Sequence, residues 1–314
     1  MIVVGGEALI DLVPLSSSVD DSLAPLRPLP GGGPYNVAIA VGRLGAPVRF
    51  VSRLSTDPFG DALIRRLELS GVDTSMVQRG TEPTTLAVAG IGPDGSARYS
   101  FHVEGTADRL VTDPGELPDE VTLLSLGTLS LLLEPGATTY ETMLRRHARR
   151  GGLTVLDPNI RPVLVSDPDA HRERFLSWLP DIGLLKLSVE DARWLAGRDG
   201  REPERAIRDW LAKGPAAAVI TRGAGGLTAL TGAGERVDVP AAPATVVDTI
   251  GAGDTVHGAL LYWLHRNGIT DPDRLRSVGP AAWREALHLA ARAAAVTVSR
   301  AGAEPPYAGE IDIL

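Results

Sequence analysis

The amino-acid sequence predicts an α/β protein, a three-layer α/β/α arrangement in which helices cover both faces of a mostly parallel central sheet. The main observation is an alternation of short apolar strands with helical segments of about 10–15 residues, which is typical of βαβ units. The composition agrees, because 44% hydrophobic and 22% charged residues over 314 positions suffice for a large folded core. Two segments, residues 12–30 and 84–108, break the alternation and predict a small separate β-sheet.

The strands and helices of the main body follow from local patterns, taken in chain order. Residues 1–5 are apolar and mostly β-branched and end in glycine, which indicates a buried strand. Residues 34–44 carry apolar side chains at helical spacing, and Pro34 stands in the first turn, where its missing N–H costs nothing. By the same reasoning we expect strands at 48–52, 121–126, 182–187 and 216–220 and one ending at Val155, and helices at 58–70, 135–149, 188–196, 203–213, 252–266 and 280–298.

The small sheet is predicted from segments that lack helical periodicity. Residues 12–30 contain four prolines, and residues 84–104 alternate in polarity around Pro93-Asp94-Gly95, a strong turn signal. Because an antiparallel hairpin does not easily join a parallel sheet, we expect 12–30 and 84–108 to form a β lid that keeps water from a reacting site. The α/β domain then comprises residues 1–11, 31–83 and 109–314.

The composition and the apolar runs exclude several classes of function. The net charge of −8 and the aromatic content of 4% argue against a nucleic-acid-binding surface. Without cysteine the chain cannot form disulfides, thiolate metal sites or a cysteine nucleophile. The longest uncharged apolar stretch, Val121 to Leu133, is shorter than the ~18 residues of a membrane span, and no basic signal-peptide region opens the chain. We therefore expect a cytoplasmic protein without nucleic-acid or membrane partners.

Lysine is scarce, and its scarcity excludes one way of binding phosphate. Only two of the 31 basic residues are lysines, Lys186 and Lys213, and neither lies in the G-x-x-x-x-G-K-[ST] pattern of a P-loop. A dinucleotide-dependent oxidoreductase is not supported either, because the first strand ends in Gly5-Gly6-Glu7 rather than in G-x-G-x-x-G. A phosphate ligand would therefore be held mainly by backbone N–H groups.

The segment from Asp248 to Thr255 (DTIGAGDT), directly before a helical run, favours such a phosphate site. Small residues at the start of a helix leave backbone N–H groups bare, and the helix N-terminus adds partial positive charge, so that the segment has the properties of an anion hole. Asp254 stands where a carboxylate could accept a proton from an attacking hydroxyl. The alternative is that Asp254 only caps the helix, since aspartate is a favoured N-cap residue.

A second glycine-rich segment, PGGGPYN at 30–36, also leads into a helix. Its glycines allow a polar ligand to approach the backbone closely, and Asn36 offers both a hydrogen-bond donor and an acceptor. The alternative is a flexible loop that ends in a helix cap, and the spacing alone does not distinguish the two interpretations.

Residues 31–60 and 248–259 resemble the two signature regions of the ribokinase-like, PfkB-type carbohydrate kinases. The resemblance covers essentially the whole chain, because further pieces also match: GEALIDLVP (6–14), DPNIRP (157–162), KLSVEDARWLAG (186–197), TRGAGG (221–226) and VSRAGA (298–303). The first two of these pieces look most like the bacterial fructokinase branch. The resemblance implies the α/β fold with a β lid, and transfer of the γ-phosphoryl group of ATP to a sugar hydroxyl.

The resemblance also implies which residues carry out this transfer. The catalytic positions are Asp254, as the base, and Gly251, Ala252 and Gly253, as the anion hole around the transferring phosphoryl group. The positions that bind the sugar hydroxyls are Asp11, Gly32, Gly33 and Asn36, with Arg161 as a further contact. Candidates on the lid are Phe101, His102 and Arg98.

The nucleotide and metal positions follow the family pattern in part. Thr221, Gly223 and Gly226 match the nucleotide loop, and Asp248 with the Ile250 carbonyl matches a site for a monovalent cation such as K⁺. The family's Asn-x-x-Glu motif is replaced by Ser188-Val189-Glu190-Asp191, in which we expect Ser188 beside the nucleotide and Asp191, with Glu190 as its competitor, to contact Mg²⁺ through water. A capping box is the alternative for this segment. Lys186 either reaches the nucleotide phosphates or is a solvated residue at the end of a strand.

These observations predict a sugar kinase that uses ATP and Mg²⁺, with K⁺ as a further cofactor and fructose as the leading substrate. A 2-keto-3-deoxygluconate kinase, a ribokinase and a nucleoside kinase of the same fold remain alternatives. A non-catalytic sugar-sensing module is an alternative from another class, but it would not need Asp254. The strand edges of the lid also make a homodimer through the lid plausible.

Overall fold

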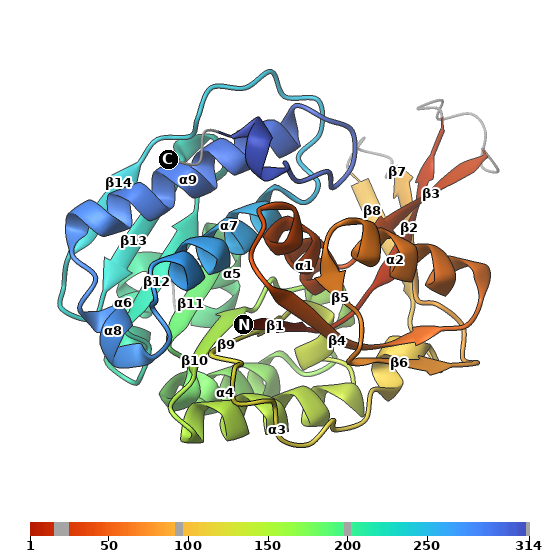
Figure 1. Ribbon diagram of the computed structural model, residues 1–314, viewed down its shortest axis with the longest axis horizontal. Coiled ribbons are helices and arrows are strands. Elements are labelled where there is room, and N and C mark those ends of the chain that lie inside the picture. The colour runs from red at the N-terminus through yellow and green to blue at the C-terminus, as the bar shows by residue number, and fades with distance from the viewer. Residues whose placement is uncertain (16–24, 92–96, 198–201, 312–314) are drawn as a thin grey trace.

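The computed structural model describes residues 1–15, 25–91, 97–197 and 202–311 of the chain. Within these ranges a ten-stranded sheet forms the centre of the molecule, in the order β14-β13-β12-β11-β10-β9-β1-β4-β5, with β6 paired to β4 (Figure 1). The neighbouring strands are parallel except at β12–β13 and β13–β14, which confirms the predicted mostly parallel sheet. The strands are β1 (Ile2–Gly5), β4 (Val48–Ser55), β5 (Val72–Asp73), β6 (Val77–Gly80), β9 (Leu123–Gly127), β10 (Leu153–Asp157), β11 (Leu184–Ser188), β12 (Ala217–Thr221), β13 (Leu227–Thr231) and β14 (Arg236–Val239).

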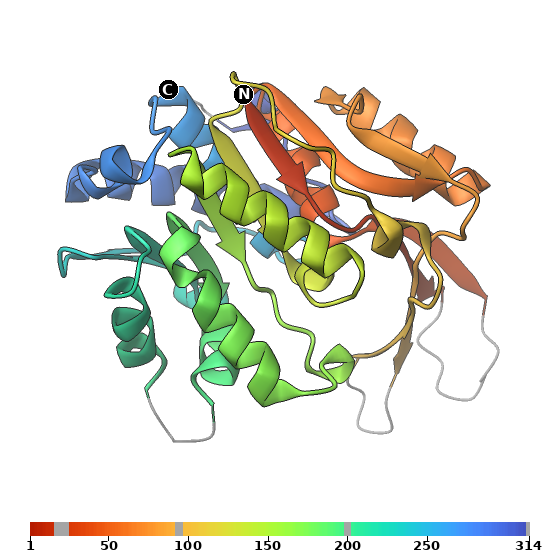
Figure 2. The ribbon, with the colours of Figure 1, turned by 90° about the horizontal axis from the view of Figure 1, so that it is seen from below.

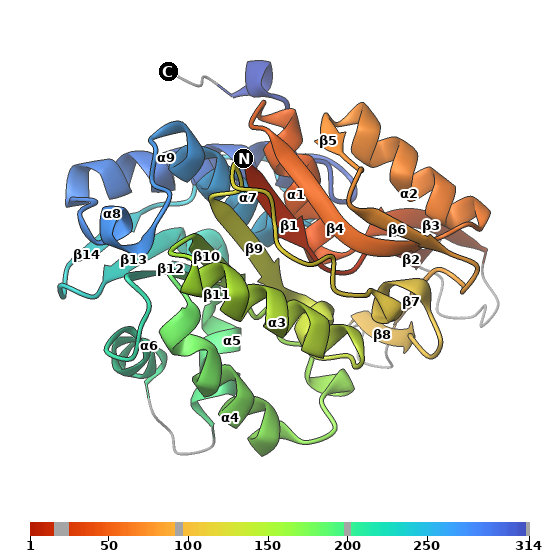
Figure 3. The same cartoon turned by 60° about the horizontal axis from the view of Figure 1, so that its bottom comes forward.

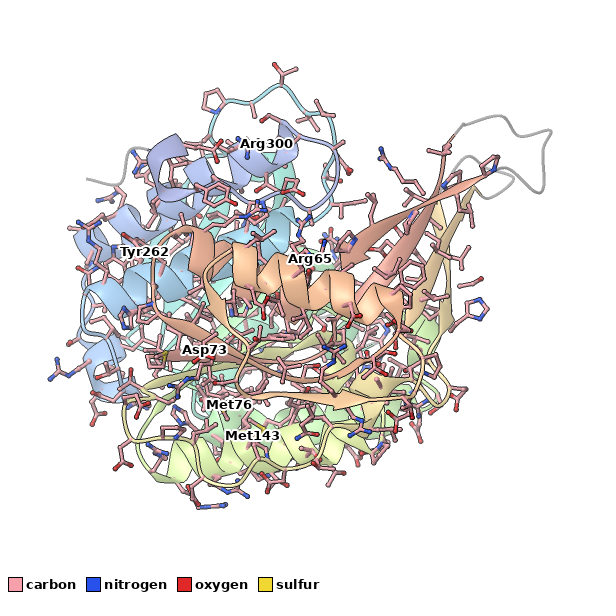
Figure 4. All side chains as sticks on the ribbon, turned by 45° about the vertical axis from the view of Figure 1, so that its right-hand side comes forward. Arg65, Asp73, Met76, Met143, Tyr262 and Arg300 are labelled. Carbon is pink, nitrogen blue, oxygen red and sulfur yellow. The ribbon has the colours of Figure 1, made fainter. Side chains whose placement is uncertain are left out.

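Helices cover both faces of this sheet, because its strands are apolar on both sides. In β1, Ile2 and Val4 pack into one apolar core and Val3 into the other, to which Met143 also belongs (Figure 4). The first core lies under α1 (Gly33–Arg43), α2 (Pro58–Leu69), α7 (Ala252–Arg266), α8 (Pro272–Arg276) and α9 (Pro280–Val298). The second lies under α3 (Gly136–Arg149), α4 (Pro168–Trp178), α5 (Val189–Ala196) and α6 (Pro203–Leu211), and Figures 2 and 3 show the two helical layers. No helix in the described ranges is both long and apolar enough to cross a bilayer.

A second, four-stranded sheet stands at one end of the molecule (Figure 1). Its order is β3-β2-β7-β8, with bounds β2 (Leu9–Pro14), β3 (Leu26–Gly31), β7 (Leu86–Ile91) and β8 (Ala97–His102). Strand β2 pairs antiparallel with β3 and parallel with β7, which in turn pairs antiparallel with β8. The small sheet expected from the sequence is therefore present, although β2 already begins at Leu9 and β3 ends at Gly31. The expected turn at Pro93-Asp94-Gly95 lies outside the described residues.

The structure contains elements that the sequence patterns did not predict. Helix α4 begins with an N-cap aspartate followed by proline, but of its residues only Phe175 and Trp178 are buried, so that its apolar stripe is too narrow to recognise. Strands β13 and β14 extend the edge of the sheet beyond β12, β13 antiparallel to β12 and β14 antiparallel to β13, where the alternation of strand and helix predicted no further strand. Helix α8 is only five residues long, too short for a periodic pattern.

Candidate functional site

A cavity of about 390 Å³ opens where the parallel strands of the main sheet end. Five wall residues on this edge end a strand or follow one within two positions: Glu7 comes after β1, Thr128 after β9 and Asn159 after β10, while Ser188 and Thr221 end β11 and β12. Ligands of open α/β sheets bind in such crevices, outside the carboxyl ends of the strands. The topology therefore gathers residues from over 200 positions of sequence into one site.

The small sheet contributes the opposite wall of the cavity. Leu9 and Asp11 reach it from β2, and Tyr99 and Phe101 from β8. The two aromatic rings stack with their centroids 6.1 Å apart. The predicted substrate residues Asp11 and Phe101 thus face the carboxyl edge of the main sheet across the cavity.

Helix α7 begins at the cavity with backbone N–H groups that no side chain caps. Its N-cap residue is Gly251, with a left-handed φ of 76°, and a Cβ atom there would come within 2.6 Å of Cβ of Ala303, so that glycine is required. Asp254 lies in the first turn of α7 instead of at the cap position. Its position contradicts the simple capping alternative and leaves the helix N-terminus free for an anion.

Asp254 is buried at the cavity and is held by one side chain of α1. Nδ2 of Asn36 donates a hydrogen bond to Oδ2 of Asp254 at 2.9 Å, across 218 positions of sequence. Burial raises the pKa of Asp254 to about 6, and the hydrogen bond from Asn36 and the positive charge of Lys186 offset this only in part. A carboxylate with a pKa near neutral, facing a cavity beside a helix N-terminus, is suited to accept and release a proton.

The predicted sugar-binding residues lie beside this pair. Gly32, Gly33 and Asn36 line the cavity where α1 begins, and Asp11 faces them from β2. Burial raises the pKa of Asp11 to about 6, and the negative charge of Asp254 adds to the rise while Arg161 opposes it. The predicted contact Arg161 also lines the cavity, where its guanidinium Nη1 donates to Oδ1 of Asn159 at 2.6 Å.

Lys186 is buried at the cavity and is not a solvated strand end. Its Nζ donates a hydrogen bond to Oδ2 of Asp157 at 2.6 Å, with both side chains about 95% buried. The same Nζ lies 3.3 Å from the position that a Cβ atom would take on Gly253, so that the ammonium group stands against the first turn of α7. Behind it His257 is buried and contacts Oγ of Ser125 through Nε2 at 3.0 Å, within the protein core. The structure therefore places a fixed positive charge beside the helix N-terminus.

The capping box considered for the Ser188 segment is present. The side chain of Ser188 accepts from the N–H of Asp191 at 3.0 Å, and Oδ2 of Asp191 accepts from the N–H of Ser188 at 2.9 Å. Oδ1 of Asp191 also accepts from the N–H of Ile160 at 2.7 Å, yet Asp191 still lines the cavity. Glu190 is exposed and does not line the cavity, and its Oε1 lies 3.9 Å from Nη1 of Arg193. Within the described ranges no group of three acidic or histidine side chains could hold a metal alone.

The other candidates for nucleotide and cation binding occupy the loops around α7 and β12. Asp248 fixes the loop before α7, since its Oδ1 accepts from the N–H of Ile250 at 3.0 Å and its Oδ2 from the N–H of Gly302 at 2.8 Å. Ile250 and Thr221 line the cavity. Gly223 and Gly226 lie in the turn between β12 and β13, outside the cavity wall.

Several wall residues were not singled out from the sequence: Glu7, Leu9, Tyr99, Thr128, Leu129, Asn159 and Thr249. Thr128 and Asn159 have positive φ values of 60° and 36°, and they are the two non-glycine residues with this conformation in the described part of the chain. Strained backbone of this kind concentrates at functional sites. For Glu7 a signal was available, because a lone acid after a buried strand and two glycines is unusual.

Comparison with known proteins agrees with this geometry. Residues 1–308 match the family model of the pfkB family carbohydrate kinases. A fructokinase of Rhizobium leguminosarum bv. trifolii is 36% identical over 286 residues, which cover 90% of this chain and 86% of the relative. Among solved structures, a fructokinase with bound ATP from Xylella fastidiosa superposes with a TM-score of 0.87 at 28% identity, over 98% of this chain and 96% of the other.

Two further solved structures widen the range of substrates among the relatives. A fructokinase double mutant from Vibrio cholerae O395, in a form with fructose, ADP and potassium ion bound, has a TM-score of 0.79 at 25% identity, with 96% of this chain and 93% of that chain covered. An aminoimidazole riboside kinase from Salmonella enterica, complexed with its riboside and an ATP analogue, has a TM-score of 0.79 at 25% identity, with coverage of 96% and 94%.

Proposed function

Because this chain belongs to the pfkB family of carbohydrate kinases, we propose that it is an ATP-dependent fructokinase in which Asp254 acts as the general base. The observation that carries the proposal is the buried pair of Asp254 and Asn36 at the uncapped start of α7, opposite Asp11 in one cavity. The identity of 36% to a fructokinase favours fructose among the sugars. A sensing module has no need for a buried carboxylate with a pKa near neutral at a helix N-terminus.

In the proposed reaction a sugar hydroxyl attacks the γ-phosphorus of ATP in line with the leaving ADP oxygen. The new bond joins the sugar oxygen to phosphorus, the bond between phosphorus and the bridging oxygen of ADP breaks, and the hydroxyl proton passes to the carboxylate of Asp254. Backbone N–H groups of Gly251 and Gly253, which line the cavity, would face the negative charge that spreads over the transferring group. The N–H of Ala252 donates to the Thr249 carbonyl at 3.3 Å and would have to leave it to take part. The ammonium of Lys186, fixed by Asp157, adds a positive charge at the same place.

The sugar is expected to bind between the start of α1 and the small sheet. Asp11, Asn36 and the backbone at Gly32 and Gly33 would contact its hydroxyls. Arg161 would contact either the sugar or the phosphoryl group, from the loop that follows β10. We propose that the small sheet of β2, β3, β7 and β8 acts as the lid expected from the sequence, carries Phe101 over the sugar and excludes water, which would otherwise hydrolyse ATP.

ATP is expected on the side of β11 and β12, with its phosphates toward α7, Lys186 and Ser188 and the rest of the nucleotide near Thr221, Gly223 and Gly226. Mg²⁺ supplies charge neutralisation when bound to the phosphates. The donor set suits it, because Mg²⁺ keeps most of its waters and needs few carboxylates. Asp191 would hold one of those waters, and Glu190 is too exposed to do so.

Three smaller proposals complete this function. A monovalent cation such as K⁺ would bind the oxygens of Asp248 and the Ile250 carbonyl, next to the anion hole, and one related fructokinase structure contains potassium. Strands β3 and β8 are the edges of the small sheet, so that a second copy could pair there to form a homodimer. A cytoplasmic location fits an enzyme that consumes ATP.

A coupled assay of ADP release over a panel of acceptors tests the proposal. The panel contains fructose, ribose, 2-keto-3-deoxygluconate, adenosine and aminoimidazole riboside, each with ATP, Mg²⁺ and K⁺. We expect the highest kcat/KM with fructose and no ADP release beyond background without an acceptor. A higher kcat/KM with another acceptor would replace fructose as the substrate. Absence of acceptor-dependent ADP release with every sugar would overturn the kinase assignment itself.

A further inference from the structure

Glu7 is a buried carboxylate in the cavity wall that the proposed phosphoryl transfer does not use. It follows β1, its exposed fraction is 3%, and three hydrogen-bond donors from two other segments converge on it. The N–H of Gly33 donates to Oε1 at 3.2 Å, the N–H of Ser130 donates to Oε2 at 3.1 Å, and the hydroxyl of Thr128 donates to Oε1. In the described part of the chain no cation forms an ion pair with Glu7, so that hydrogen bonds compensate its charge.

The partner that matters most for a ligand is Thr128. This residue lines the cavity, and its φ of 60° is unusual for a β-branched side chain. Its methyl group Cγ2 lies 2.5 Å from the position that a Cβ atom would take on Gly33, so that glycine at 33 makes room for it. With the methyl group against Gly33 and the hydroxyl against Glu7, the side chain has one orientation.

This orientation fixes the hydrogen-bonding sense of the Thr128 hydroxyl. A hydroxyl has a single proton, and an ionised carboxylate only accepts, so that Thr128 donates its hydrogen to Glu7 whenever Glu7 is ionised. The lone pairs of the Thr128 oxygen are then all that remains for a ligand. The N–H groups of Gly33 and Ser130 are also committed to Glu7, so that neither is available as a donor in their place.

Two neighbouring groups on the sugar side are acceptors too, while Arg161 is a donor near Asp11. Oδ1 of Asn36 is buried and has no partner among the described residues, because the amide nitrogen is the atom that binds Asp254. Asp11 adds a carboxylate on the opposite wall. This side of the cavity therefore matches a ligand rich in O–H donors, as a polyhydroxylated sugar is.

We propose that Glu7 is a specificity-determining positioning residue: it holds the Thr128 hydroxyl as an obligate acceptor, so that the substrate must present a hydroxyl that donates at this point. The proposal rests on the sugar kinase function above and deepens it. Glu7 itself need not touch the sugar. The cost of mismatch is set by Thr128, since a substrate without a donor there leaves a buried oxygen unpaired.

Deoxyfluoro sugars test the sense of this hydrogen bond. Fluorine replaces a hydroxyl at similar size but cannot donate, so we compare kcat/KM of fructose with that of its deoxyfluoro analogues at each hydroxyl that is not phosphorylated. Measurements at pH 8.5 keep Glu7 ionised, because burial raises its pKa to about 7. For the wild type we expect fluorine to lower kcat/KM by about 10–100-fold at the hydroxyl that faces Thr128, and also at hydroxyls bound by Asp11 or Asn36; the position that faces Thr128 is the one whose penalty depends on Thr128.

Variants at both residues then show whether Glu7 acts through Thr128. In Thr128→Ala the penalty at that position should fall to about threefold or less, and in the matched control Thr128→Ser, which keeps the hydroxyl, it should persist. In Glu7→Met the Thr128 hydroxyl no longer donates to residue 7, so that it can turn its hydrogen toward the fluorine. The loss of kcat/KM caused by fluorine should then again fall to about threefold or less. The ratio of two substrates within one enzyme is the readout, and a general loss of activity cancels from it.

Each outcome that differs from these expectations contradicts a different step of the proposal. An unchanged penalty in Thr128→Ala would show that Thr128 does not contact a sugar hydroxyl, and a retained penalty in Glu7→Met would show that Glu7 is only structural. If Glu7→Met does not fold, Glu7→Asp withdraws the carboxylate by one methylene and is judged by the same ratio. Failure of the kinase assignment would appear earlier, as absence of turnover with fructose itself.

Discussion

The substitution Asp254→Asn separates the chemical role of the buried carboxylate from its effect on folding. The two side chains have nearly the same shape, and the amide oxygen of asparagine can still accept the hydrogen bond from Asn36. An amide cannot accept the proton of the attacking hydroxyl. We therefore expect kcat with fructose to fall by about 10²–10⁴-fold, the usual range for loss of a general base, while the cavity keeps its shape.

The same substitution should stabilise the fold at alkaline pH. Burial raises the pKa of Asp254 to about 6 from an ordinary value of 3.8. The folded protein thus binds this proton more tightly than the unfolded chain, and ionisation of Asp254 lowers the free energy of unfolding as the pH rises from about 4 to about 6. A rise of about two pKa units means that the wild type loses about 3 kcal/mol of unfolding free energy when Asp254 ionises. Asparagine does not ionise, so that Asp254→Asn avoids this loss. In a chain of 314 residues this equals a rise in Tm of about 5 °C at pH 8, and no gain near pH 4.

The assay is ADP release at saturating fructose together with thermal unfolding at pH 4.5, 6 and 8. Asp108→Asn is a matched control, because Asp108 is also a fully buried aspartate, accepts hydroxyl hydrogen bonds from Thr85 and Thr106, and does not line the cavity. We expect this control to keep kcat within about threefold. Turnover near that of the wild type in a folded Asp254→Asn protein would refute the role of Asp254 as base. A Tm at pH 8 several degrees below the wild type would refute the electrostatic argument.

Two further predictions concern Asp254 and Gly251 at the start of α7. Initial rates between pH 5 and 8.5 should show kcat/KM for the sugar rising through about pH 6 and then levelling, because Asp254 accepts a proton only when ionised; a flat profile from pH 5 to 7 would contradict this. Gly251→Ala should lower the free energy of unfolding in urea by about 1–3 kcal/mol and kcat by at least about tenfold, because its φ is 76° and its Cβ would meet Ala303 at 2.6 Å. Gly45→Ala, with a φ of 89° and no atom within 4 Å of its Cβ, should cost about 1 kcal/mol and leave kcat unchanged; equal kcat in both variants would contradict the role of the Gly251 backbone.

Part of the site could be predicted from the sequence because two of its motifs follow strands of one parallel sheet. The DPNIRP segment and the Ser188 segment follow the neighbouring parallel strands β10 and β11, which end at the same edge, whereas the glycines before Asn36 follow β3 of the small sheet. The Gly-Ala-Gly pattern before Asp254 also indicated an uncapped helix start, and the structure has Gly251 at the cap position. Local pattern and topology agree wherever a loop connects a parallel strand to a helix.

The environment of single side chains could not be predicted in this way. The sequence left open whether Lys186 reaches the nucleotide phosphates or is a solvated residue at the end of a strand. The structure buries it against Asp157, which comes from the neighbouring strand. Thr128 takes a left-handed backbone that its own chemistry disfavours, so that no local rule would place it there. In both cases a long-range contact overrides local preference, and only the fold reveals the contact.

The cavity has opposite hydrogen-bonding character on its two sides, and Asp254 lies between them. Toward the proposed nucleotide site the structure presents the N–H groups at the start of α7 and the ammonium of Lys186. Toward the proposed sugar site it presents the Asp11 carboxylate and Oδ1 of Asn36, to which the proposed role of Glu7 adds the Thr128 oxygen, while the guanidinium of Arg161 is a donor near Asp11. In the proposed complex this division would orient the two substrates toward each other and place Asp254 to accept the released proton.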